Sequence, residues 1–463
     1  MHYQQEGLLL PEQKVPALDA DLESSLSAVL GGHNEIYSEL TVASEKKELI
    51  SEAWKDGQNP SLTLEVADED QLFLRQSALR QWKRELLDND ELDPDIKQLY
   101  RWKVNEHIAN INMLIASNQG DMPNFARWNE FIYGKPDEAI YRGALDWVAS
   151  DAERLVSDPE QPEVVVVAAQ DVLSMLDGKR GYRELLSPDS ETFEKVRADH
   201  MQQTGYYGLL LAGVEVPRGK ITTAIADPII EQVLRNIKSS KDVRDASGSS
   251  WSVVSDAVLR PKTMNMPYQR FVGLGLGHEV GSHELERVNG SRGPIALASE
   301  GLDRVELGNE GRAVIREQVP YETFDEFGKL VRWRDILRRH IAISYASGVG
   351  EDMPAASSDV YTFVNTIDRM YALKLKPQDE RVAEESAHKK TTDLLLRVLK
   401  GTDGLGGAYL KDKVYLEGHV ASWLSAAQRG PRAIAEGDLG KFDINNPRHL
   451  NALRKFGLLP EEE

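Results

Sequence analysis

The sequence predicts a mixed α+β protein that is predominantly helical and contains a small sheet. Apolar residues recur every three or four positions in long segments before residue 156, as in amphipathic helices. Short runs rich in β-branched residues follow Pro162, as in strands, and the helical spacing returns from Pro267. The chain has 463 residues, enough for more than one core. We expect a helical N-terminal region over residues 1–155 and a second domain over residues 156–463.

The N-terminal region is expected to contain three long helices. The helical spacing covers residues 75–87, 96–117 and 136–156. Segments 121–123 and 134–136 contain glycine, proline or aspartate and predict breaks between helices.

The small sheet is expected to lie between residues 162 and 263. The valine run 164–168 predicts a buried strand, and 221–225 and 251–254 are shorter candidates. Residues 258–263 predict an edge strand. Segment 238–250 is rich in Ser, Lys, Asp and Gly, and it predicts a mobile surface loop.

Helical spacing resumes over residues 267–289, where Gly290 suits the position after a helix end. Residues 325–400 are expected to be mostly helical, with loops near 348–358 and 376–379. The acidic tail after Leu458 is expected to fray.

Charge and cysteine content exclude several classes of function. The net charge of −20 argues against binding nucleic acid or an anionic membrane, and it disfavours highly acidic polypeptides as substrates. The absence of cysteine excludes disulfides, thiolate nucleophiles and cysteine-ligated metals. The first residues lack the basic and apolar parts of a signal peptide, and no apolar run approaches the ~20 residues of a membrane span. We therefore expect a cytoplasmic protein.

Residues 278–283 read HEVGSH and predict a metal site. A catalytic zinc ion takes three ligands from His and Glu or Asp and leaves one position for water. His278 and His283 offer two nitrogens, and Glu279 is placed to act as the general base. A purely structural pair of histidines is the alternative.

The spacing of the two histidines predicts a distorted helix. Five residues at 100° each leave the rings about 140° apart on a regular α-helix, too far for one ion. A π-type turn would bring them together, and Gly281 makes that distortion less costly. We therefore predict a π-bulge or local unwinding at residues 280–283.

Residues 308–316 offer the third ligand. Asn309 is expected to cap a second helix, with Glu310 in its first turn as the ligand. Ala313 is small enough to let this helix approach the first. Glu317, two turns after Glu310, is expected at the surface, and orientation of a ligand is the alternative.

These segments resemble the zinc metallopeptidase family that is marked by an HEIGTH-type and a QEGLA-type motif. The family includes the vertebrate microtubule-associated tyrosine carboxypeptidases and bacterial proteins named for the QEGLA motif. The motifs stand here as HEVGSH at 278–283, NEGRA at 309–313, and a KDxxYLxG-type segment at 411–418. The segment 131–136 and Gly301-Leu302 are also similar. The resemblance covers most of the chain from about residue 70.

The resemblance implies a zincin-like metallopeptidase domain over residues 156–463, with zinc on His278, His283 and Glu310. It places Arg397, Lys411 and Tyr415 near the active site. A carboxypeptidase needs a cation for the terminal carboxylate of its substrate, and Arg397 and Lys411 are the candidates. Tyr415 is the candidate for a hydrogen bond to the oxyanion.

The chain departs from the family pattern at several positions. Asn309 and Arg312 replace the glutamine and leucine of the second motif, and Lys400 stands where an arginine is expected. His419 lies one turn after Tyr415 and is a further candidate for the site. The sequence names neither a substrate nor an oligomeric state.

The expected function is a zinc-dependent carboxypeptidase that acts on the C-terminus of a peptide or protein. The alternatives are a metalloendopeptidase and a non-catalytic zinc-binding protein that serves regulation or interaction. Glu279 favours an enzyme, because a structural zinc ion needs no general base.

Overall fold

The computed structural model describes residues 8–11, 18–30, 46–63, 68–248 and 250–459. The protein is mostly helical with few and short strands, as the sequence predicted. The tail from residue 460, for which we predicted fraying, lies outside the described residues. Among the residues that are described, no helix is both long enough and apolar enough to cross a membrane.

The first half of the chain up to the strands consists of helices. They are α1 (Ala20–Leu30), α3 (Lys46–Lys55), α4 (Glu69–Asp88), α5 (Pro94–Asn118), α6 (Met122–Tyr133), α7 (Glu138–Ser157), α8 (Glu163–Met175), η1 (Arg183–Leu186), α9 (Ser190–Met201) and α10 (Tyr206–Leu210). Helices α4, α5 and α7 confirm the three that were predicted. The predicted breaks are confirmed on both sides of α6, where Asp121 caps its start and Gly134 ends it with a positive φ of 73°.

The strand predicted at residues 164–168 is wrong, because this segment lies inside α8. Its buried residues are Val165, Ala168, Ala169 and Val172, which share one face of a helix. A continuous apolar run has no period of its own, so its spacing alone could not distinguish a buried strand from a helix.

In the described part of the chain, five short strands form two small sheets. The strands are β1 (Lys220–Thr222), β2 (Asp242–Asp245), β3 (Ser252–Val253), β4 (Ala257–Arg260) and β5 (Asn265–Pro267). Strands β1 and β5 pair antiparallel, whereas β4 lies between β2, which is parallel to it, and β3, which is antiparallel. The strand expected at residues 251–254 is confirmed by β3.

Three other predictions in this part of the chain need correction. The strand predicted for 258–263 is confirmed over residues 258–260 by β4, but its predicted place at the edge is wrong, because β4 is central in its sheet. The predicted loop 238–250 contains β2, whose charged residues face solvent and hide the strand pattern. The strand predicted for 221–225 ends at Thr222, since helix α11 (Thr223–Asn236) begins at the next residue.

The rest of the chain is helical. It contains α12 (Tyr268–Arg270), the π-helix η2 (Phe271–Glu284), α13 (Leu285–Arg292), α14 (Leu297–Glu300), α15 (Glu306–Gln318), α16 (Phe324–Gly328), α17 (Val331–Ala346), α18 (Ser357–Leu375), α19 (Glu380–Val398), η3 (Leu410–Lys413), α20 (Val414–Arg429), α21 (Arg432–Glu436), η4 (Gly437–Leu439) and α22 (Pro447–Lys455). Helices α17 to α19 and their loops confirm the prediction for residues 325–400. Gly290 does not end the helix as predicted, because α13 continues to Arg292. Gly290 instead lets the backbone of Ala298 approach closely.

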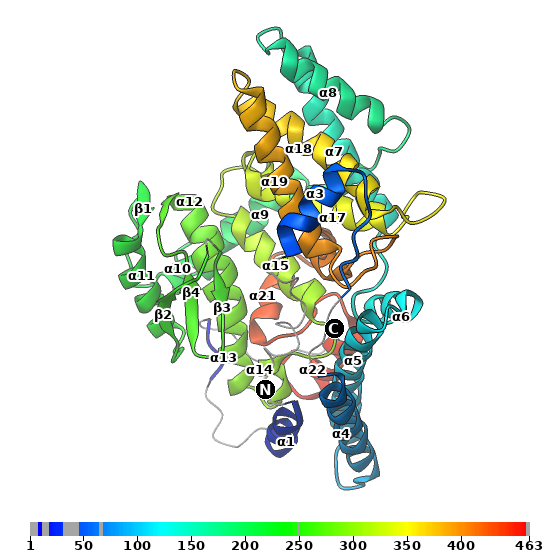
Figure 1. Ribbon diagram of the computed structural model, residues 1–463. Helices are drawn as coiled ribbons and strands as arrows, with labels where there is room; N and C mark the ends of the chain where they lie inside the picture. The colour runs from blue at the N-terminus through cyan, green and yellow to red at the C-terminus, as the bar shows by residue number, and fades with distance from the viewer. Residues whose placement is uncertain (1–7, 12–17, 31–45, 64–67, 249, 460–463) are drawn as a thin grey trace.

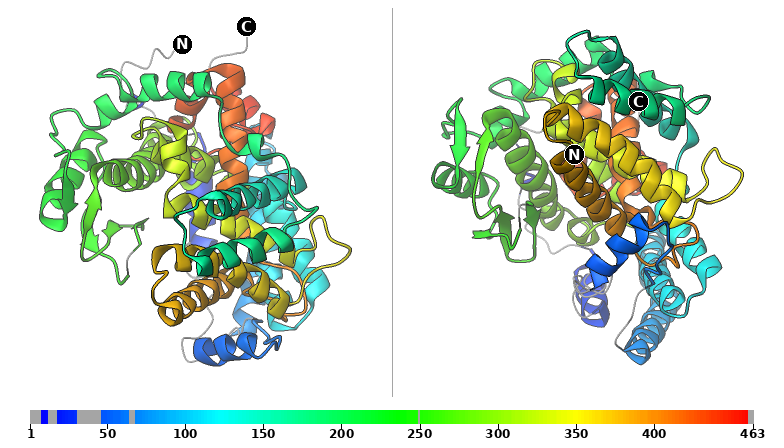
Figure 2. Two further views of the ribbon diagram at one scale, coloured as in Figure 1. Left: turned by 90° about the horizontal axis from the view of Figure 1, so that it is seen from above. Right: turned by 45° about the horizontal axis from the view of Figure 1, so that its top comes forward.

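The strands lie together with α11 at one side of the molecule in every view, whereas the long helices α18 and α19 lie side by side elsewhere (Figures 1 and 2). The π-helix η2 and α15 lie against each other between these parts. The division predicted at residue 155 stays a prediction. Hydrogen bonds join the two parts: Asn129 of α6 donates to Ala408 O (2.6 Å) and accepts from Leu410 N (3.1 Å).

One buried side chain connects both ends of the described chain. The Asn289 carbonyl oxygen accepts from Leu10 N (2.9 Å), and its amide nitrogen donates to Leu8 O (2.8 Å) and Asp438 O (2.7 Å). Asn289 lies on α13, directly after the helix that contains His278 and His283. The segments around residues 8–10 and 438 are therefore tied to the helix that holds the two histidines.

Candidate metal centre

His278 and His283 lie on η2 and face the same neighbour, helix α15. Their ring centroids are 5.0 Å apart and the ring planes are nearly perpendicular, at 84°. The π-type hydrogen bonding brings two side chains five residues apart to one face, which confirms the predicted distortion. It extends over 14 residues rather than the four that were predicted.

Glycines allow this wide helix to pack closely against its neighbours. A β-carbon at Gly277 would overlap the Tyr207 hydroxyl group, and one at Gly281 would overlap the Tyr206 hydroxyl group. The Tyr207 hydroxyl donates instead to the backbone oxygen of Arg316 on α15 (2.6 Å). The glycines therefore make room for the two tyrosines that join the histidine helix to its neighbours.

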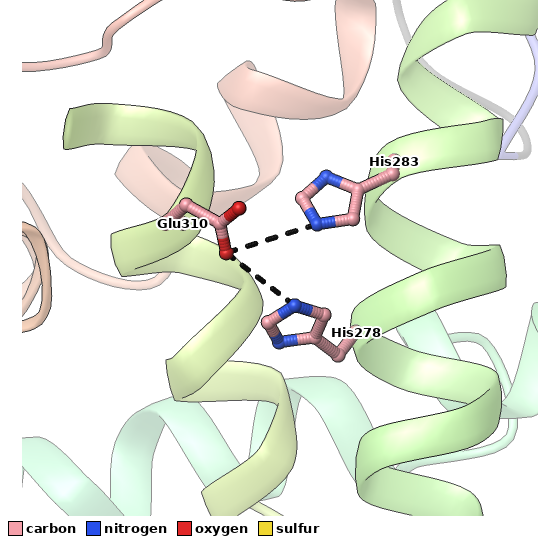
Figure 3. A group of neighbouring side chains, drawn as sticks. All are labelled: His278, His283 and Glu310. Carbon is pink, nitrogen blue, oxygen red and sulfur yellow. Dashed lines mark ion pairs between the residues drawn. The ribbon is translucent and has the colours of Figure 1, made fainter. Parts of the chain in front are cut away.

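Glu310 comes from α15 and points between the two imidazoles (Figure 3). Its Oε2 atom lies 3.4 Å from Nε2 of His278 and 3.8 Å from Nε2 of His283. The helix begins at Glu306, so Asn309 is not its N-cap and Glu310 lies in the second turn, contrary to the prediction. The Asn309 side chain accepts a hydrogen bond from Arg312 instead (3.0 Å).

These three side chains could hold a metal ion. One ligand atom from each lies within 4.8 Å of the others. The Glu310 Oε2 atom is buried and makes no hydrogen bond with a described residue. A buried carboxylate oxygen without a donor is costly unless a cation satisfies it. Two imidazole nitrogens and one carboxylate oxygen are the donor set that zinc and similar divalent metals accept.

The electrostatics of the group favour a cation between the ligands. Burial lowers the pKa of His283 to about 3, so its imidazole is neutral and its lone pair is available. Burial raises the pKa of Glu310, but the two imidazoles outweigh it and lower the pKa to about 2. Burial lowers the pKa of His278, yet its contacts with Glu310 and Glu317 raise it to about 10. Without a metal the group thus retains a proton, which a metal ion would replace.

Glu317 is buried beside His278, so the predicted surface position is wrong. Its Oε1 atom lies 2.8 Å from Nδ1 of His278. Both of its oxygens also accept hydrogen bonds from Arg332 of α17, at 2.9 and 2.7 Å. A carboxylate behind a histidine ligand fixes the orientation of the ring and makes its other nitrogen a better donor. The orienting role, considered as the alternative, fits this geometry.

Glu279 is buried next to the three candidate ligands and has no partner of its own. Its exposed fraction is 8%. It forms no hydrogen bond or ion pair with any residue in the described part of the chain. Burial raises its pKa to about 7, with His278 opposing and Glu310 and Glu317 adding to the effect. A carboxylate with such a pKa can accept and release a proton near neutral pH.

Tyr415 lies close to the candidate ligands, on the first turn of α20. Burial raises its pKa, and the charge of Glu310 is the next largest cause, so the phenol stays neutral. Its hydroxyl makes no hydrogen bond with a described residue and is available to another group. This arrangement is compatible with the predicted role.

The predicted substrate-binding cations already have partners. Arg397 donates two hydrogen bonds to Asp412, one of them at 2.9 Å. Lys411 lies 3.3 Å from Glu306. The Lys400 ammonium lies 4.8 Å from the centre of the Tyr409 ring.

His419 is not a ligand of the candidate site. It is fully buried, and its Nε2 atom lies 2.9 Å from Leu186 O, while Nδ1 lies 3.1 Å from the Gln318 amide. Both ring nitrogens are therefore occupied by hydrogen bonds and are not available to a metal ion. Arg312, which departs from the motif pattern, is also buried, and it pairs with Glu286 of α13 at 2.9 Å.

Sequence reasoning missed Arg332 and Arg339, which lie on α17 beside Tyr415. Their guanidinium carbons are 5.6 and 5.3 Å from the centre of the Tyr415 ring. The segment 332–339 contains four arginines and resembles an exposed basic helix. Two of them, seven residues apart, lie on one helix face, and that spacing is the signal that was available.

Comparison with family models, curated proteins and solved structures found no match for this chain. The resemblance to the metallopeptidase family therefore stays a prediction that rests on the motifs.

Proposed function

We propose that the protein is a zinc-dependent peptidase with a zincin-like catalytic domain, and that it is a carboxypeptidase. One observation supports the proposal above all. The ligand atoms of His278, His283 and Glu310 lie within 4.8 Å of one another, and the buried carboxylate of Glu279 lies beside them without a partner among the described residues. A structural metal site has four protein ligands and no need for a base. Three candidate ligands and a free carboxylate support a catalytic site.

A bound zinc ion supplies a Lewis acid that makes a water molecule more acidic and polarises a carbonyl group. Glu279 accepts the proton of the attacking water and delivers it to the leaving amine. Glu317 holds the His278 ring in place through Nδ1. The Tyr415 hydroxyl donates a hydrogen bond to the carbonyl oxygen as it gains negative charge. Two Glu279 protonation states are accessible near pH 7, which suits both steps.

The preference for a carboxypeptidase follows from the basic residues around Tyr415. Arg332, Arg339 and Arg397 lie near its ring, although the whole chain carries a net charge of −20. Of these, Arg339 has only a 3.8 Å contact with Asp412, and such a cation suits a substrate that ends in a carboxylate.

The experiment that tests the proposal is digestion of a peptide library by the purified zinc-loaded protein, with mass-spectrometric readout. We expect loss of C-terminal residues, and no loss after removal of the metal by a chelator. Glu279→Gln should bind zinc as the wild type does and should lose hydrolysis. Glu322→Gln, at an exposed carboxylate, is the matched control and should remain active. Equal products from the wild type and Glu279→Gln would overturn the peptidase proposal, and internal cleavage would replace it by an endopeptidase.

A further inference from the structure

Three arginines lie around Tyr415, which is close to the candidate ligand Glu310, and their partners differ. Arg332 and Arg339 come from α17 and lie beside the Tyr415 ring, at 5.6 and 5.3 Å from its centre. Arg397 comes from α19, and its charge also acts on the Tyr415 hydroxyl. The Tyr415 hydroxyl in turn is close enough to Glu310 to feel its charge. The guanidinium groups therefore lie one aromatic ring away from the candidate metal ligands.

Only two carboxylates, Glu317 and Asp412, contact these three guanidinium groups in the described part of the chain. Glu317 accepts two hydrogen bonds from Arg332. Asp412 accepts two from Arg397. Arg339 is left with Asp412 Oδ2 at 3.8 Å, an oxygen that already accepts from Arg397. With the residues that the structure describes, Arg339 makes no hydrogen bond.

Arg339 is a poorly solvated cation whose contact with Asp412 is long and is shared with Arg397. Its side chain is 18% exposed, so some of its surface remains accessible to a ligand. Burial lowers its pKa, and the charges of Arg397 and Arg332 lower it further, while Asp412 is the one carboxylate that opposes them. A guanidinium has five N–H donors in a planar fork and binds a carboxylate through two parallel hydrogen bonds. An incoming carboxylate would supply what Arg339 lacks.

We propose that Arg339 is the residue that binds the terminal carboxylate of the substrate, and that Arg397 and Lys411 have other roles. Arg397 donates two hydrogen bonds to Asp412, so Asp412 does not neutralise the charge of Arg339. Lys411 is held by Glu306. This inference deepens the proposed function, on which it rests, because it limits the substrates to peptides with a free C-terminal carboxylate.

The experiment measures binding, so that turnover does not enter the result. The probes are four fluorescein-labelled pentapeptides that end in Ala, Leu, Phe or Lys, each as the free acid and as the C-terminal amide. Zinc-loaded full-length Glu279→Gln is titrated with each probe, and fluorescence anisotropy gives Kd. We expect at least one acid to bind about tenfold or more tightly than its amide. Equal affinity for every acid and amide, or binding of none, would overturn the inference.

Variants of α17 then assign the effect to Arg339. In the Glu279→Gln background, Arg339→Met should bring the acid and amide affinities together, and Arg339→Lys should retain part of the difference. Arg334→Met is the matched control on the same helix, because Arg334 contacts Tyr371 and Lys329 O instead. It should keep the full difference. A difference that survives in a folded Arg339→Met protein, as judged by its thermal unfolding, would also overturn the inference.

The two proposals can fail separately. Hydrolysis of peptides together with equal acid and amide affinities would leave the peptidase function and remove the role of Arg339. Conversely, a preference for the acid that depends on Arg339 in a protein without hydrolysis would retain the carboxylate site and refute the peptidase.

Discussion

Nδ1 of His278 lies 2.8 Å from Oε1 of Glu317, on the opposite side of the ring from Glu310. The imidazole is therefore in contact with a carboxylate through each of its nitrogens. A metal ion that replaces the contact with Glu310 would bind a histidine whose orientation and donor strength are already set by Glu317.

The first prediction concerns this carboxylate. Glu317→Gln removes the charge that holds the His278 ring, and we expect the affinity for zinc to fall roughly 10- to 100-fold. Competition with a fluorescent chelator would measure it. Glu322→Gln, at an exposed carboxylate in the same part of the chain, should bind zinc like the wild type. An unchanged zinc affinity in Glu317→Gln would show that the contact has no part in metal binding.

The second prediction concerns removal of the metal. A ligand that binds the folded state alone stabilises it, by about 4 kcal/mol at a concentration 1,000 times its Kd. We expect zinc to raise the Tm of the chelator-treated protein and a second chelator treatment to reverse the rise. His283→Ala removes one of three ligands, so its Tm should respond far less to the same zinc concentration. An equal rise in both proteins would place the zinc elsewhere.

The third prediction concerns the close packing of η2. In Gly281→Ala the new methyl group overlaps the Tyr206 hydroxyl group. We expect the free energy of unfolding to fall by about 1–3 kcal/mol, as in overpacked cores, and the zinc affinity to fall as His283 is displaced. Urea unfolding and zinc titration would measure the two effects. Gly219→Ala is the control, because a β-carbon there meets no atom within 4 Å. A Gly281→Ala protein as stable as this control would contradict the close contact between Gly281 and Tyr206.

The fourth prediction concerns pH. Burial raises the pKa of Asp303, but hydrogen bonds from His449 and Arg304 outweigh it and lower the pKa to about 2. A carboxyl whose pKa is lower in the folded than in the unfolded state stabilises the fold above the unfolded pKa. This contribution is lost as the pH falls towards the folded pKa. Asp303→Asn should therefore cost about 2 kcal/mol at pH 6, and the cost should shrink below about pH 4.

Urea unfolding of the wild type and Asp303→Asn at pH 6, 5, 4 and 3 would test this dependence. Asp352→Asn, at an exposed carboxylate, serves as the control and should differ little from the wild type throughout. A cost that grows as the pH falls would reverse the predicted sign.

The sequence predicted the local features of the site better than its surroundings. The five-residue spacing of His278 and His283 predicted a π-type turn, because one ion cannot reach both rings on a regular helix. Nothing in that argument set the length of the π-helix. The π-helix also packs closely against Tyr206 and Tyr207, which come from a distant part of the chain and which the spacing could not reveal.

Residues that act through tertiary contacts could not be predicted from motifs. Glu317 was expected at the surface because its partner, Arg332, belongs to another helix. Asn309 was expected as a cap since it belongs to a residue type that favours caps, but the helix begins three residues earlier. The strand prediction for the valine run in α8 was wrong for a different reason. A continuous apolar run fits a buried strand and a helix equally well.

The three hydrogen bonds of Asn289 have a consequence for biosynthesis. The helix with both histidines is emerging from the ribosome well before the segment around Asp438 has been translated. Until that segment arrives, Asn289 lacks one acceptor and the buried pair of Arg316 and Asp438 cannot form. The three candidate metal ligands therefore reach their final geometry late in synthesis, after the segment around Asp438 has been translated.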